Sequence, residues 1–91
     1  MTGEEFVRLC FEEKESILRE YCDPETESTV GAMVRELVSA GADQETLHKL
    51  LDLVLTENWY RMLLALDGSA SLGGEQMTYE VRDEDGNILN E

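Results

Sequence analysis

The sequence predicts an α+β fold: three helices followed by a small C-terminal antiparallel β-meander of two or three strands. Two patterns support this prediction. Up to residue 66, apolar residues recur at intervals of three and four, which indicates helices that bury one face. Beyond residue 68, apolar and polar residues alternate between Gly-containing turns, which indicates short strands. A chain of 91 residues fits one domain, 1–91, with a modest core.

The first helix is predicted over residues 3–21. Thr2 and Glu5 have the spacing of a capping box, which marks a helix N-terminus. The helix is expected to end where the chain reaches Asp23-Pro24. One apolar stripe contains Phe6, Cys10, Ile17 and Tyr21, and Val7, Phe11 and Leu18 lie beside it.

The second helix is predicted over residues 24–40. Asp23 is expected to cap it, and Pro24 suits the first helical position, where no N–H is needed. Gly41 is expected to end the helix in a left-handed conformation. Its apolar stripe contains Val30, Met33, Val34, Leu37 and Val38.

The third helix is predicted over residues 44–66, with Asp43 as its cap. From residue 59 to residue 66 apolar residues surround the helix, interrupted only by Arg61. A helix that is apolar on every side is typically buried on every side. We therefore expect this half of the helix to form the centre of the fold.

Strands are predicted over residues 69–72, 76–82 and 87–90. Gly73-Gly74 is a two-residue hairpin signal that pairs the first two strands. This register places Ala70, Leu72, Met77, Tyr79 and Val81 on one face, and we expect that face to pack on the third helix.

The second turn of the meander has two alternatives. A two-residue Asp85-Gly86 loop would put Leu89 on the polar face of the sheet. A three-residue loop over residues 84–86, with Gly86 left-handed, places Val81 opposite Leu89 and keeps Leu89 on the apolar face. We favour the second alternative for that reason.

The charge of the chain restricts its partners. Twenty-one acidic and seven basic residues give a net charge of −14. Residues 1–27 contribute −6, residues 28–66 contribute −2, Asp67 contributes −1 and residues 75–91 contribute −5. This field repels nucleic acid and anionic membranes, so neither is an expected partner. A basic protein partner would be attracted to it.

Composition also indicates the compartment and argues against a metal or cofactor. The N-terminus lacks the pattern of a signal peptide and no apolar run approaches a membrane span, so a cytoplasmic location is expected. Cys10 and Cys22 lie about 18 Å apart along a helix, which predicts reduced thiols. The segment from Asp83 to Gly86 does not match a calcium loop, and no metal or cofactor is predicted.

Acidic side chains are the candidate partner-binding residues. Those of the first helix are Glu12, Glu13, Glu15 and Glu20, and those of the tail are Glu80, Asp83, Glu84 and Asp85. Arg61 is a further candidate, because it stands alone in an apolar segment and would orient a carboxylate of the partner. Glu57 precedes Arg61 by four residues and offers it a structural ion pair instead.

No catalytic motif is present, so the sequence predicts a non-enzymatic acidic interaction protein that docks a basic protein partner. Its size and acidity are compatible with small inhibitors or immunity proteins that mask a basic surface. One alternative is a self-associating structural domain, a homodimer formed through the outer strand edge or through the apolar third helix. Another is an enzyme with a carboxylate or thiol site that the sequence does not reveal.

Overall fold

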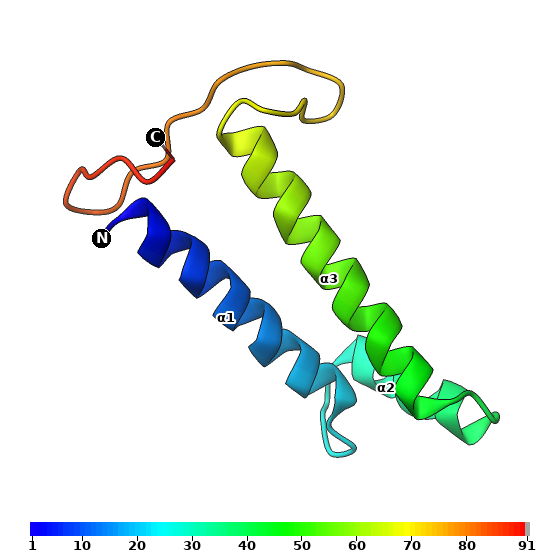
Figure 1. Ribbon diagram of the computed structural model, residues 1–91. Coiled ribbons are helices and arrows are strands. Elements are labelled where there is room, and N and C mark those ends of the chain that lie inside the picture. The colour runs from blue at the N-terminus through cyan, green and yellow to red at the C-terminus, as the bar shows by residue number, and fades with distance from the viewer. Residues whose placement is uncertain (91) are drawn as a thin grey trace.

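The computed structural model describes residues 1–90, and this part of the chain contains three α-helices and no β-strand. The helices are α1 (Gly3–Cys22), α2 (Thr29–Ser39) and α3 (Gln44–Leu66). In Figure 1, α1 and α3 lie side by side, α2 sits at one end of the pair, and residues 67–90 cross the other end. The predicted α+β fold is therefore wrong, because the protein is essentially all-α.

α1 and α3 begin and end close to their predicted limits, because each is capped at its start by a side chain only three residues from the N–H that it binds. The Thr2 hydroxyl accepts a hydrogen bond from the Glu5 N–H at 3.1 Å and starts α1. Asp43 accepts one from the Thr46 N–H at 3.1 Å and starts α3. α3 then continues without a break to Leu66.

The predicted start of α2 is wrong by five residues. Asp23 does not cap a helix: its carboxylate accepts from the Glu25 N–H and its carbonyl from the Thr26 N–H, which closes a turn around Pro24. The Ser28 hydroxyl caps α2 instead, accepting from the Gly31 N–H at 3.0 Å. Pro24 suits both a turn and the first position of a helix, so the position of the cap, Ser28, decides where α2 begins.

The predicted end of α2 is confirmed. Gly41 follows the last turn with a φ of 103°, a left-handed conformation that suits glycine.

The three predicted strands, 69–72, 76–82 and 87–90, are not formed, although both predicted turns are. Leu72 and Glu75 exchange two backbone hydrogen bonds around Gly73-Gly74. The second turn has the three-residue loop, which is the favoured alternative.

That loop is identified by its register. The Leu89 N–H donates to the Val81 carbonyl at 2.8 Å, and Gly86 is left-handed at a φ of 85°. The pairing ends after one or two residues in each turn.

The strands do not form because the apolar face that they would present is not packed against a helix. Met77 is 58% exposed and Leu72 is also exposed, so the predicted apolar face does not pack on α3. The Asn90 side chain takes the backbone groups that a strand partner would use, binding Tyr79 and Val81. Two-stranded ribbons without a buried face are marginal in water.

The core is small for a chain of this length. The buried apolar residues within residues 1–90 are Cys10, Leu18, Ala65 and Leu89. The radius of gyration is 16.4 Å, whereas a compact domain of this length has about 12 Å. The expectation that residues 59–66 are buried all round is wrong, because Tyr60 and Met62 are exposed.

Candidate functional site

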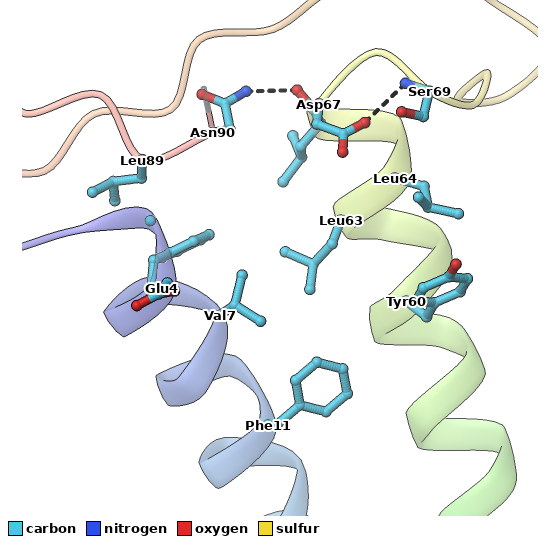
Figure 2. Close-up of a pocket in the computed structure, with 13 residues that line it drawn as sticks. Glu4, Val7, Phe11, Tyr60, Leu63, Leu64, Asp67, Ser69, Leu89 and Asn90 are labelled. Carbon is cyan, nitrogen blue, oxygen red and sulfur yellow. Dashed lines mark hydrogen bonds between the residues drawn. The ribbon is translucent and has the colours of Figure 1, made fainter.

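An apolar groove lies between α1 and α3 at the end where the tail crosses. It has a volume of about 800 Å³. Figure 2 shows Val7 and Phe11 on α1, with Leu63 on α3, pointing into the space between the two helices. The residues that line the groove are Gly3, Glu4, Phe6, Val7, Phe11, Tyr60, Leu63, Leu64, Leu66, Asp67, Ser69, Leu89 and Asn90.

Helical spacing explains why these side chains converge. Val7 and Phe11 are four residues apart, so they occupy one face of α1. On α3, Leu63 points toward α1, whereas Tyr60 and Leu64, four residues apart, point to the other side of the helix and line only the edge of the groove (Figure 2). The apolar stripe of α1 therefore builds one wall of the groove, and the apolar second half of α3 supplies Leu63 to the other.

Asn90 fixes the tail over one end of the groove. Its amide nitrogen donates to the carbonyl of Leu66, the last residue of α3, at 2.6 Å and to the Tyr79 carbonyl at 2.7 Å. Its amide oxygen accepts from the Val81 N–H at 2.8 Å. One side chain thus joins the end of α3 to two points of the tail and positions the buried Leu89 against both hollows of the site.

Close backbone approach holds the tail against α1 as well. A Cβ atom on Gly3 would lie 2.5 Å from the Leu89 carbonyl oxygen, so only glycine fits at this contact. The Met1 amine also donates to the Asp83 carboxylate at 3.0 Å.

The charged residues that line the groove are both acidic. Glu4 lies in the first turn of α1, and Asp67 caps the C-terminus of α3. Hydrogen bonding to Ser69 lowers the pKa of Asp67, including a bond from the Ser69 N–H at 2.9 Å, and keeps its carboxylate ionised. The groove therefore has an apolar floor with a carboxylate at its rim on each helix.

A second hollow of about 450 Å³ adjoins the groove and shares Phe6 and Leu89 with it. Trp59 also lines this hollow. Glu13 of α1 and Asp83 of the tail, two predicted partner-binding residues, meet here although they are 70 residues apart in sequence. The two predicted acidic patches therefore approach each other at this point.

The other predicted acidic residues do not line either hollow. Three of them are engaged: Glu12 pairs with Arg8, Glu15 with Lys14, and Glu80 with Arg82. The remaining three, exposed and without an ion pair in the described part of the chain, are Glu20, Glu84 and Asp85.

Arg61 lies on the exposed surface of α3, away from both hollows. No ion pair to it, from Glu57 or from any other residue, is formed within residues 1–90. It is therefore available to a partner, but not at the same surface as the acidic candidates.

Asp83 has a structural role in the tail turn. Its carboxylate accepts hydrogen bonds from the Asn87 side chain at 3.0 Å and from the N–H groups of Asp85 and Asn87. These bonds, together with the Met1 amine, hold the pKa of Asp83 far below its usual range. Its oxygens are directed at the turn rather than at a ligand.

Lys14 has a structural role that was not predicted from the sequence. It is only 6% exposed and its ammonium donates to the Asp52 carboxylate at 2.8 Å, which ties α1 to α3. This hydrogen bond raises the pKa of Lys14 and lowers the pKa of Asp52. A signal does exist in the sequence, because Lys14 lies on the apolar stripe four residues after Cys10 and four before Leu18.

The remaining chemistry of the chain is sparse. Burial raises the pKa of the Cys10 thiol, which lowers the fraction of reactive thiolate. Between residues 1 and 90, no three His, Cys, Asp or Glu side chains are grouped to hold a metal ion. No helix in the same range is long and apolar enough to cross a membrane.

Comparison of the chain with protein-family models, with curated proteins and with solved structures gave no match. The functional assignment therefore rests on the groove and on the charges around it.

Proposed function

We propose that this protein is a non-enzymatic interaction domain that binds a basic amphipathic helix of another protein in the groove between α1 and α3. The observation that carries the proposal is an open apolar groove of about 800 Å³ with carboxylates as its only charged lining residues within the described part of the chain. The free thiols Cys10 and Cys22 are compatible with a reducing compartment, and we place the complex in the cytoplasm.

The shape of the groove favours a helical ligand. Packed helices lie about 8–10 Å apart and insert side chains between those of their neighbours. One wall of the groove presents side chains at helical spacing, from Val7 and Phe11, and Leu63 points toward them from the other wall. A partner helix would place an apolar stripe on this floor, which is the usual form of helix-in-groove recognition.

Charge selects the class of partner. Glu4 and Asp67 would flank the bound helix, and Glu13 extends the acidic surface into the adjoining hollow. Lysine or arginine residues beside the apolar stripe of the partner would meet these groups. A second copy of this chain, with a charge of −14, would instead be repelled at this end.

A designed peptide tests the proposal even though the natural partner is unidentified. The probe is an amphipathic helix of about 18 residues, roughly 27 Å long, with a leucine stripe flanked by lysine. The chain has one tryptophan, and Trp59 lines the adjoining hollow, so its emission reports binding by a peptide without aromatic residues. We expect saturable binding that weakens as salt is raised.

Two matched leucine variants separate groove binding from general attraction to an acidic protein. Leu63→Gln lies in the groove and should weaken binding by about tenfold or more. Leu53→Gln lies on the exposed surface of the same helix and should leave binding unchanged. Equal effects of the two substitutions, or equal binding of a peptide with glutamate in place of lysine, would contradict the proposal.

A further inference from the structure

α3 carries a second apolar surface, which shares only Tyr60 with the lining of the groove. Leu50, Leu53 and Tyr60 occupy three of the four successive seam positions of a coiled-coil heptad pattern, Glu57 occupies the remaining one, and Val54 lies beside them. Leu53 is 60% exposed and Tyr60 is 59% exposed, and Leu50 and Val54 are exposed to a similar extent. We name these four apolar residues the outer stripe. It runs along α3 and reaches the edge of the groove at Tyr60.

The charge around the outer stripe differs from that of the rest of the chain. α3 contains three acidic and two basic residues, a net charge of −1, within a protein of net charge −14. A basic partner would gain little attraction here. Two copies of the chain, in contrast, would bring these faces together with little repulsion.

The outer stripe also has charges of both signs beside it. Lys49, Glu57 and Arg61 are exposed on the same helix. In a twofold contact the same patch is used by both subunits, so the bases of one copy can meet the acids of the other. Arg61, which has no ion pair within residues 1–90, would then find a carboxylate on the second copy.

The chain as a whole exposes more surface than a compact protein of its mass. The chain exposes 6691 Å², whereas a compact protein of the same mass exposes about 5,400 Å². A stable interface needs about 800 Å² from each partner. The excess is larger than this value, so part of the surface of the isolated chain can be buried in an interface.

From these observations we infer that the outer stripe of α3 is a self-association surface that pairs with the same stripe of a second copy. This inference is independent of what occupies the groove. The pairing would leave Val7, Phe11 and Leu63 accessible to a partner, because the groove walls face the space between α1 and α3.

Light scattering during size-exclusion chromatography tests the inference directly. The wild-type chain should have about twice its monomer mass of 10.3 kDa at high concentration. The double variant Leu50→Gln/Leu53→Gln should be a monomer. Leu63→Gln in the groove and Met33→Gln/Leu37→Gln, an equally exposed pair on α2, should remain dimers. Circular dichroism should show unchanged helix content in every variant.

Arg61→Glu gives a second, charge-based test. It removes the base that would meet a carboxylate of the second copy. The dimer of this variant should therefore be weaker and dissociate at a higher protein concentration than the wild-type dimer. A wild-type monomer at millimolar concentration would overturn the inference. A dimer that persists in both Leu50→Gln/Leu53→Gln and Arg61→Glu would also overturn it. The same holds for a dimer that only Met33→Gln/Leu37→Gln disrupts.

Discussion

The two ends of the α1–α3 pair are built differently. At the α2 end, Leu18 is buried and Lys14 binds Asp52 across the two helices. At the tail end, Ala65 is buried but other side chains of both helices line an open groove, and Leu89 and Asn90 of the tail add contacts to the two helices. One end of the pair is therefore closed by its own side chains, and the other depends on a segment without regular structure.

This difference indicates how the molecule separates stability from binding. The closed end supplies the contacts that hold the helices together. The tail end holds apolar side chains around an open groove, which leaves a concave surface that a partner can bury. Substitutions at the two ends should therefore have different consequences.

The largest expected difference is between Leu18→Ala and Leu63→Ala. Leu18 is 4% exposed, so its truncation should lower the free energy of unfolding by about 2–4 kcal/mol. Leu63 lies at the open groove, and its truncation should cost about 1 kcal/mol. Urea unfolding followed by circular dichroism measures both. Equal losses would mean that the two ends are equally well packed.

Asn90→Ala should release the tail while leaving the helices in place. Three hydrogen bonds are lost, so the local opening free energy of residues 67–90 should fall by about 2 kcal/mol. Hydrogen exchange followed by mass spectrometry should show faster exchange there and unchanged exchange in α2. Faster exchange throughout the chain would show that the tail is part of the main folding unit.

Lys14→Met tests the tie at the closed end. The variant keeps the length and apolar character of the side chain and loses the bond to Asp52, which is partly exposed. The expected loss of stability is about 1 kcal/mol. Lys49→Met is the matched control, because the ion pair between Lys49 and Glu45 is long and exposed, and the substitution should cost less than about 0.5 kcal/mol.

The pH dependence of the same variant gives a sharper test. The pKa of Asp52 is lowered by folding, so its contribution is complete above about pH 5 and is lost as the pH falls through the folded pKa. The pKa of Lys14 is raised, so its contribution is complete below about pH 9 and is lost as the pH rises through the folded pKa. The difference in stability between wild type and Lys14→Met should therefore be flat between about pH 5 and 9 and smaller outside that range. A difference that does not vary with pH would contradict the ion pair.

Local signals in the sequence are sufficient to predict α1, α3 and both turns of the tail. Caps such as Thr2 and Asp43 act within three residues, and Gly86 sets its turn by its own conformation. The strands could not be predicted correctly because a strand needs a packed face and a paired neighbour. Neither condition is visible in the alternation of residues such as Leu72 and Met77.

The candidate site is predictable only in part. The excess of carboxylates is evident in the sequence, but their positions are not, and only Glu13 and Asp83 of the predicted residues meet at a hollow. The groove itself depends on how far α3 and the tail leave α1 uncovered. That is a property of tertiary packing, which is why the all-apolar pattern from residue 59 to residue 66 does not lead to complete burial.

The central claim is that a basic amphipathic helix occupies the groove between α1 and α3. Methyl and amide chemical shifts of the labelled protein, titrated with the lysine–leucine peptide, test it most directly. The largest changes should fall on Val7, Phe11, Leu63 and Leu89. Changes confined to exposed carboxylates, or centred on α2, would contradict the claim.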